Sequence, residues 1–167
     1  MAAEALVSYL LIIYHSRTDG SRQMAEAAKG GANSEITTRL VRATEAGPDE
    51  LLAARGYIFC GPENLAALSG PMKDFFDRCY YAVLGRIEGR PYAQMICAGS
   101  DGASAARQIA RIAQGWRLRE VQPPLIVCTK AQTHEAILAE KTILSDQLGR
   151  CRYLGEAMGA GIAMGIY

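Results

Sequence analysis

Apolar runs alternate with segments of helical periodicity along the whole chain. Residues 6–14 form a near-continuous apolar run, and residues 21–32 then place small apolar side chains at helical spacing. Further predicted strands cover residues 36–41, 56–62, 91–100 and 123–130. Further predicted helices cover residues 47–55, 71–84 and 103–116, and a final helix is expected to be capped by Thr133. This repeated alternation predicts a parallel sheet between two layers of helices, joined by right-handed crossovers.

The fold class is therefore predicted to be α/β, as a three-layer α/β/α sandwich. A chain of 167 residues is long enough for one core and too short for two ordinary domains, so residues 1–167 are expected to form a single domain. The sequence GAGIAMG (159–165) resembles a nucleotide-binding turn, but no strand precedes it. We interpret its small residues as allowing the last helix to pack closely.

Charge and cysteine content exclude several classes of function. Lys and Arg number 18 against 17 Asp and Glu, and this balance gives no case for nucleic-acid binding. The N-terminal apolar run of about ten residues is too short to span a bilayer, and the preceding Glu4 is unlike a signal peptide. Five scattered cysteines without a CxxC indicate reduced thiols and no metal site. We therefore expect a cytoplasmic protein without membrane insertion.

The turn after the first predicted strand, YHSRTDGSRQM (residues 14–24), is rich in hydrogen-bond donors. Ligands of open α/β sheets bind beyond the carboxyl ends of the strands, and a helix N-terminus favours an anion. The turn therefore predicts a phosphate site, although Asp19 or Ser21 as a plain helix cap remains the alternative. Its pattern is neither the GxxxxGK[ST] of a P-loop nor the GxGxxG of a dinucleotide turn. It also lacks the nucleophilic cysteine of a low-molecular-weight phosphatase and the acidic residues of a receiver domain.

Three segments together resemble one family. YHSRTDGSRQMAEA resembles the phosphate loop of flavodoxin-like flavoproteins, GYIFCGPENLAALSGPMKDFFDR resembles their second flavin loop with its MK-x-F-x-DR helix, and AGSDGAS is similar to their third loop. The chain thus resembles the flavodoxin-like FMN-binding superfamily over almost its whole length. Within it, the chain is most similar to NAD(P)H-dependent FMN/quinone reductases of the tryptophan-repressor-binding-protein type. The resemblance implies a five-stranded parallel sheet in the order 2-1-3-4-5.

The resemblance also implies an FMN site made by three loops. The implied phosphate ligands are Ser16, Arg17, Thr18, Gly20 and Ser21. The residues expected along the isoalloxazine ring are Pro62, Glu63, Asn64 and Leu65, and those expected at its pyrimidine side are Gly99, Ser100, Asp101 and Gly102. No catalytic acid or base is assigned, because the flavin carries the chemistry.

Two departures from the family pattern bear on function. Asp19 stands where the phosphate loop usually has glycine, and its charge would oppose a phosphate unless it points outward, toward Arg17 or Arg22. Asp tolerates left-handed backbone geometry, so we expect it to point outward. The second and third loops contain no aromatic residue that could shield a flavin ring. An open ring face favours an enzyme over an electron carrier, although it is equally compatible with weak or lost flavin binding.

The functional prediction is an FMN-dependent oxidoreductase that passes electrons from NADPH or NADH to a quinone-like or other small acceptor. The alternatives are a flavodoxin-type electron carrier with a protein partner, and a flavin-free binding module of the same fold. The resemblance implies a homo-oligomer, either a dimer or a tetramer. His15 is read as a loop histidine or a ligand contact, and Cys60 as a small buried hydrophobe or a redox-sensitive thiol.

Overall fold

The computed structural model describes residues 7–167, and the fold has the predicted strand–helix alternation. The first predicted strand includes Leu6, which lies outside the described residues. The elements are β1 (Tyr9–Tyr14), α1 (Gly20–Ala32), β2 (Thr37–Arg42), α2 (Pro48–Ala53), β3 (Gly56–Asn64), β4 (Ala67–Leu68), α3 (Gly70–Val83), β5 (Pro91–Ala98), α4 (Ala103–Gly115), β6 (Arg119–Glu120), β7 (Leu125–Cys128), α5 (His134–Leu138) and α6 (Ser145–Ala163).

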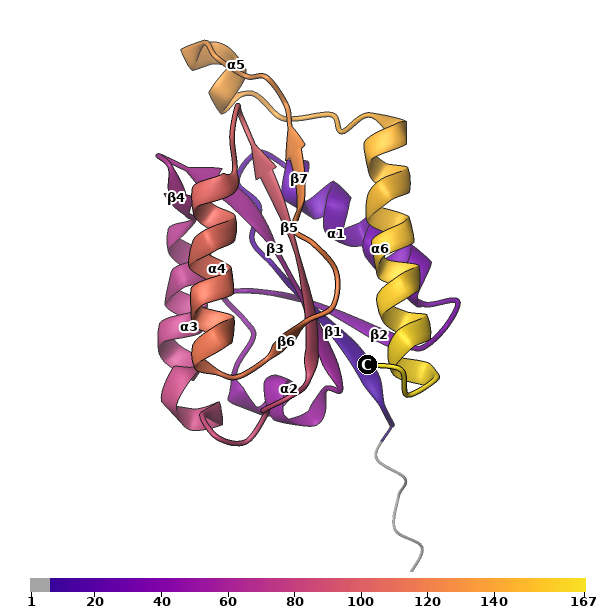
Figure 1. Ribbon diagram of the computed structural model, residues 1–167. Helices are drawn as coiled ribbons and strands as arrows, with labels where there is room; N and C mark the ends of the chain where they lie inside the picture. Colours follow the sequence, from indigo (N-terminus) through magenta and orange to yellow (C-terminus); the bar gives the residue numbers. More distant parts are fainter. Residues whose placement is uncertain (1–6) are drawn as a thin grey trace, which may run out of the picture.

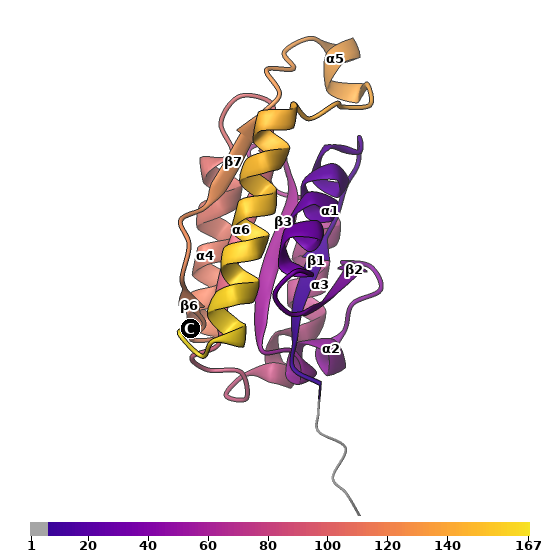
Figure 2. The same ribbon diagram turned by 90° about the vertical axis from the view of Figure 1, so that its right-hand side faces the viewer.

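The longer strands form a parallel sheet in the order β2-β1-β3-β5-β7. This order confirms the predicted 2-1-3-4-5, because β7 is the fifth strand that the sequence predicted. The sheet of the described residues has two further strands of two residues each, β4 and β6, which the sequence analysis missed. Helices α3 and α4 cover one face of the sheet, and α1 and α6 cover the other (Figures 1 and 2).

Alternate residues of the central strands supply two separate cores. Leu11 and Ile13 of β1 pack with Phe59 of β3 under α3 and α4, while Leu10 and Ile12 pack under α1 and α6. All these side chains are buried, which explains why β1 has an unbroken apolar sequence instead of an alternating one. The sheet is thereby held rigidly from both sides, and the loops at its carboxyl edge start from fixed points.

Close packing of α1 against α6 depends on glycines. A Cβ at Gly159 would lie 3.0 Å from the Ala32 carbonyl oxygen, and one at Gly155 would overlap the backbone at Ala28. The prediction that small residues let the last helix pack closely is confirmed at Gly159. No helix within residues 7–167 is long and apolar enough to cross a membrane.

The third strand is longer than predicted. It was expected to end at Gly61-Pro62, but β3 continues to Asn64 and turns back into β4 as an antiparallel hairpin. The turn residues Leu65 and Ala66 both have positive φ, at 50° and 58°. A turn of this geometry normally carries Gly, Asn or Asp, so Leu-Ala gave no turn signal in the sequence.

The last predicted helix is in fact two helices. Thr133 does act as an N-cap, since its Oγ1 accepts a hydrogen bond from the Ala136 N–H at 3.1 Å. The helix that it caps is the five-residue α5, and the final helix α6 begins separately at Ser145. In Figure 1, α5 stands above the carboxyl edge of the sheet, apart from both helical layers.

Candidate functional site

The three predicted loops leave neighbouring strands at one edge of the sheet. Tyr14 pairs with Cys60, and Pro62 pairs with Cys97, so the ends of β1, β3 and β5 are adjacent. The His15 N–H donates to the Cys60 carbonyl at 3.0 Å, which binds the first loop to the base of the second. The placement of all three loops at the same edge agrees with the sequence analysis.

The first loop presents a row of free backbone donors. No protein acceptor within residues 7–167 receives a hydrogen bond from the N–H groups of residues 16–21. Successive free amides at the start of a helix form an anion-binding concavity, and the dipole of the 13-residue α1 adds positive potential. The Ser21 hydroxyl is also buried, and it has no hydrogen-bond partner in the part of the chain that the structure describes. The loop therefore has unused donors of the kind that a phosphate group requires.

Ser16 and Asp19 organise this loop. The Ser16 hydroxyl accepts a hydrogen bond from the Arg22 N–H at 3.2 Å and so caps the first turn of α1. Asp19 has a left-handed backbone conformation with φ 72°. Its Oδ2 accepts hydrogen bonds from the Arg22 guanidinium Nη2 at 3.0 Å and from the Gln23 side-chain amide at 3.0 Å. The hydrogen bond from Arg22 lowers the pKa of Asp19. The expectation that Asp19 points toward an arginine is confirmed for Arg22.

Gln23 joins the first loop to the segment after α5. Its amide nitrogen donates to the Lys141 carbonyl at 2.6 Å, and its amide oxygen accepts from the Ile143 N–H at 3.0 Å. The Lys141 N–H in turn donates to the Thr18 carbonyl at 2.8 Å. The segment 139–143 therefore lies beside the first loop, an arrangement that the sequence analysis did not predict.

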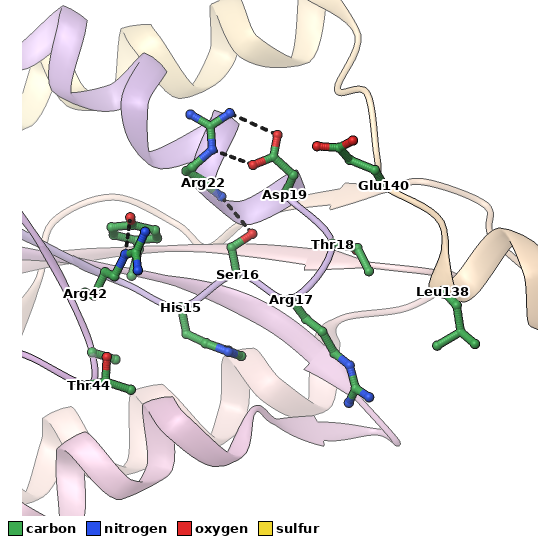
Figure 3. A pocket seen from close by; sticks show the side chains of 12 residues that line it. His15, Ser16, Arg17, Thr18, Asp19, Arg22, Arg42, Thr44, Leu138 and Glu140 are labelled. Carbon is green, nitrogen blue, oxygen red and sulfur yellow. Dashed lines mark hydrogen bonds and ion pairs between the residues drawn. The ribbon is translucent and has the colours of Figure 1, made fainter.

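A polar cavity of about 520 Å³ opens beside the first loop (Figure 3). It is lined by Tyr14, His15, Ser16, Arg17, Thr18, Asp19, Arg22, Arg42, Ala43, Thr44, Leu138 and Glu140. Its volume is in the range of small-ligand sites. Arg42 and Thr44, at the end of β2, were missed by the sequence analysis, although parallel topology places that strand end at the same edge. The second and third loops do not line this cavity.

His15 lies between the first loop and the start of α3. Its Nδ1 is 2.9 Å from the Ser69 hydroxyl, at hydrogen-bond distance. Burial and then the nearby Arg17 charge lower the pKa of His15 from its ordinary value, because both disfavour the protonated ring. A neutral imidazole is therefore favoured here near pH 7.

The hairpin places the predicted ring-side residues unevenly. Pro62, Glu63 and Asn64 are half-buried at the end of β3, whereas the Leu65 side chain is fully exposed at the hairpin tip. Non-glycine residues with positive φ are uncommon and concentrate at functional sites. The exposed tip and its backbone geometry are consistent with a binding loop.

The third loop is tied to the hairpin by Glu63. The Glu63 carboxylate accepts hydrogen bonds from the Gly102 N–H at 3.0 Å and the Ala105 N–H at 3.1 Å. Gly102 is buried with φ 85°, and a Cβ there would lie 2.6 Å from Ile126 Cγ2. Glycine is thus required at position 102 by backbone geometry and by packing on the sheet. Ser100 and Asp101 remain exposed.

The cysteines and possible metal ligands add no second site. Burial raises the pKa of the Cys60 thiol well above its ordinary value, and its Sγ lies 3.4 Å from the Ser21 carbonyl. Cys60 is thus a buried apolar residue, in agreement with the simpler of the two interpretations. Within the described part of the chain, no cluster of His, Cys, Asp or Glu has the arrangement of a metal site.

Comparisons with known proteins agree with this architecture. No family model matches the chain. A curated flavodoxin from Aquifex aeolicus (strain VF5) is 27% identical over 161 residues, which cover 93% of this chain and 87% of that protein. Among solved structures, a flavodoxin from the domain Archaea gives a TM-score of 0.75 at 18% identity, covering 92% of this chain and 98% of the other. A flavodoxin, WrbA-like protein from Agrobacterium tumefaciens gives 0.66 at 15% identity, covering 95% and 98%.

The sheet order, the flanking helices and the first loop define an α/β sandwich with a donor-rich turn at the carboxyl edge of its sheet. Together with the comparisons, they show that this chain has a flavodoxin-like fold.

Proposed function

We propose that this protein binds FMN, with the phosphate held by the first loop. The observation that carries the proposal is that, among residues 7–167, neither the N–H groups of residues 16–21 nor the buried Ser21 hydroxyl at the start of α1 has a hydrogen-bond partner. Neutral backbone donors and a helix dipole bind a phosphate without activating it for transfer. The resemblance of this loop to a flavin phosphate loop supports the same assignment.

The chain's own residues would perform three tasks. Residues 16–21 would bind the phosphate, while Arg22 and Gln23 keep the Asp19 carboxylate engaged away from it. The hairpin 63–68 and the loop 99–102 would flank the ring. When bound, FMN supplies one- and two-electron redox chemistry, and the protein supplies its position and its electrostatic surroundings.

We further propose an oxidoreductase that takes electrons from NADPH or NADH and reduces a quinone-like or other small acceptor. Support comes from the second and third loops, in which no aromatic side chain is available to cover a flavin ring. The formal charge of +1 also differs from the strong acidity that helps many small redox shuttles find basic partners. A homo-oligomer, a dimer or a tetramer, remains a prediction, which light scattering of the purified protein tests.

An electron carrier is the second candidate. It is favoured by the curated relative, which is named a flavodoxin and matches 93% of this chain. Aerobic oxidation of NADH and NADPH, measured with and without a benzoquinone, separates the two functions. Turnover with the quinone supports the reductase. No oxidation, combined with reduction of the flavin in two separate one-electron steps, supports the carrier.

The FMN assignment is tested first by the absorbance spectrum of the purified protein and by identification of the released cofactor. The double variant Ser16→Ala/Thr18→Ala should bind FMN at least tenfold more weakly than the wild type. Ser34→Ala is a matched control, because Ser34 also bonds the backbone, through Oγ to the Gly31 carbonyl at 2.7 Å, at the far end of α1. A colourless protein that gains no thermal stability from FMN would refute both flavin functions and support a flavin-free binding module.

A further inference from the structure

Glu63 connects two segments that are far apart in the sequence. Its Oε1 accepts from the Gly102 N–H at 3.0 Å and its Oε2 from the Ala105 N–H at 3.1 Å, across 39 and 42 positions of the chain. One carboxylate at the end of β3 thus holds both the end of the third loop and the first turn of α4. The side chain is half-buried, so these bonds are partly shielded from water.

The start of α4 depends on this remote group. Its N-cap residue is Gly102, which has no side chain to offer as a cap. Asp101 accepts one bond, from the Ala103 N–H at 3.2 Å, and Glu63 satisfies two further amides. A negative charge at a helix N-terminus is also favourable to the helix dipole. Glu63, which lies on β3, therefore completes the cap of α4 that Asp101 provides only in part.

A third hydrogen bond also attaches the hairpin to this helix. The Leu68 N–H donates to the Gln108 side-chain oxygen at 2.7 Å, so both strands of the hairpin are attached to α4 or its N-terminus. Leu68 is also the residue that pairs with Glu63 across the hairpin. The hairpin and the third loop are thus joined into one unit, even though the turn between Glu63 and Leu68 contains two residues of unfavourable backbone geometry.

We propose that Glu63 is a positioning residue that sets the separation between the hairpin 63–68 and the loop 99–102, so that the slot for the flavin ring is formed before the cofactor binds. The inference rests on the proposed function for the identity of the ring. It differs from the sequence-based expectation, which placed Glu63 along the ring. The Glu63 carboxylate instead accepts a hydrogen bond from the Gly102 N–H. Among residues 7–167, no acceptor receives a hydrogen bond from the N–H groups of Ser100 and Asp101.

The test compares Glu63→Gln with Glu50→Gln. A glutamine at position 63 offers one acceptor oxygen, and its NH₂ group must face the other backbone N–H, so one of the two bonds is lost. Glu50 is a matched control: its Oε2 accepts from the Gly47 N–H at 2.9 Å at the start of α2. In Figure 1, α2 lies at the end of the sheet opposite the hairpin.

Amide hydrogen exchange of the FMN-free proteins tests the hydrogen bonds that Glu63 accepts from Gly102 and Ala105. We expect the amides of residues 102–105 to exchange at least tenfold faster in Glu63→Gln than in the wild type, and to be unchanged in Glu50→Gln. Unchanged exchange in Glu63→Gln would overturn the inference whether or not FMN binds. This readout therefore separates failure of the inference from failure of the proposed function.

FMN titration then tests the consequence for the ring slot. Glu63→Gln should raise the FMN dissociation constant at least tenfold and shift the flavin midpoint potential upward, because a negative charge near the ring site is removed. Glu63→Asp should recover part of the affinity, since it keeps a two-oxygen carboxylate on a shorter stem. An affinity and a potential like those of the wild type in Glu63→Gln would show that Glu63 is a helix cap only.

Discussion

Replacement of Asp19 is the most direct test of the phosphate loop. Asp19 combines a left-handed backbone, a carboxylate paired with Arg22 and a bond from the Gln23 amide. Asp19→Asn removes the charge and keeps a side chain that tolerates positive φ, whereas Asp19→Gly also removes the conformational cost. Asp19→Ala removes the charge and adds left-handed strain, so the three variants separate charge from geometry.

The magnitudes follow from the surroundings of the side chain. The Asp19 and Arg22 side chains are 23% and 44% exposed, so solvent screens their ion pair and its contribution to stability is small. Left-handed geometry costs an ordinary residue roughly 1–2 kcal/mol, and Asp less. Asp19→Gly should therefore change the free energy of unfolding by less than about 1 kcal/mol, because the two effects oppose each other. Asp19→Ala should lose about 1–2 kcal/mol.

The effect on ligand binding has the opposite sign. Asp19 lines the cavity, and its carboxylate repels a phosphate dianion, so removal of the charge in a solvated site should strengthen phosphate binding by roughly 1 kcal/mol, or about fivefold in affinity. Calorimetric titration with inorganic phosphate and with FMN should show tighter binding to Asp19→Asn and Asp19→Gly, with a smaller gain at high salt. Weaker binding of both ligands to both variants would refute the view that Asp19 opposes the phosphate.

Three further predictions test other parts of the site. Gln23→Ala should lower the free energy of unfolding, measured by urea denaturation, by about 1–3 kcal/mol, because the Lys141 carbonyl and the Ile143 N–H lose their partner. The control is Gln147→Ala, since the Gln147 side chain forms its hydrogen bonds with the exposed side chains of Asp146 and Arg150 near the start of α6. Gly102→Ala should destabilise the folded protein by about 2–4 kcal/mol, because alanine disfavours positive φ and its Cβ would overlap side chains of the sheet. The control Gly70→Ala has open space around the new Cβ and should change stability little. Equal effects of the two substitutions would contradict the packing argument. NMR titration should place the pKa of His15 below 6.5. At His15 the folded state then binds fewer protons than the unfolded chain. The contribution of His15 to the free energy of unfolding is therefore present above about pH 6.5 and is lost as the pH falls toward its pKa in the folded protein. A His15→Gln variant that loses the same stability over this pH range would refute this explanation.

The sheet could be predicted because each strand is a short apolar run and such runs recur along the chain between helical segments. Apolar runs such as residues 9–14 are buried on both faces, and the helices between them have a clear period. The hairpin at residues 63–68 was missed because its turn, Leu65-Ala66, lacks the residues that normally adopt positive φ. The division into α5 and α6 was missed because an N-cap residue indicates where a helix begins and not where it ends. Thr133 was correctly predicted to be an N-cap, and the helix that it caps is α5.

The position of the site was predictable, whereas its internal contacts were not. The strand order alone places the three loops at one edge of the sheet. The negative charge of Asp19 is stabilised by a neighbouring arginine, so its contact with Arg22 could also be expected from the sequence. The links made by Glu63 and Gln23 join residues 39 to 120 positions apart, and no spacing in the sequence encodes them. Arg42 is the last residue of β2, whose alternation of apolar and polar residues is weak, so only the completed topology shows that it lies beside the first loop.

The attachment of residues 139–143 to the first loop has a consequence for the protein's lifetime. Thr18 and Gln23 form hydrogen bonds with Lys141 and Ile143, so we expect the first loop and the chain around α5 to open as one cooperative unit. We therefore expect an anion bound at the first loop to stabilise this unit and to slow proteolysis of the exposed chain near α5. Under the proposed function, cofactor binding and resistance to proteolysis are linked through the contacts that Thr18 and Gln23 make with residues 141 and 143.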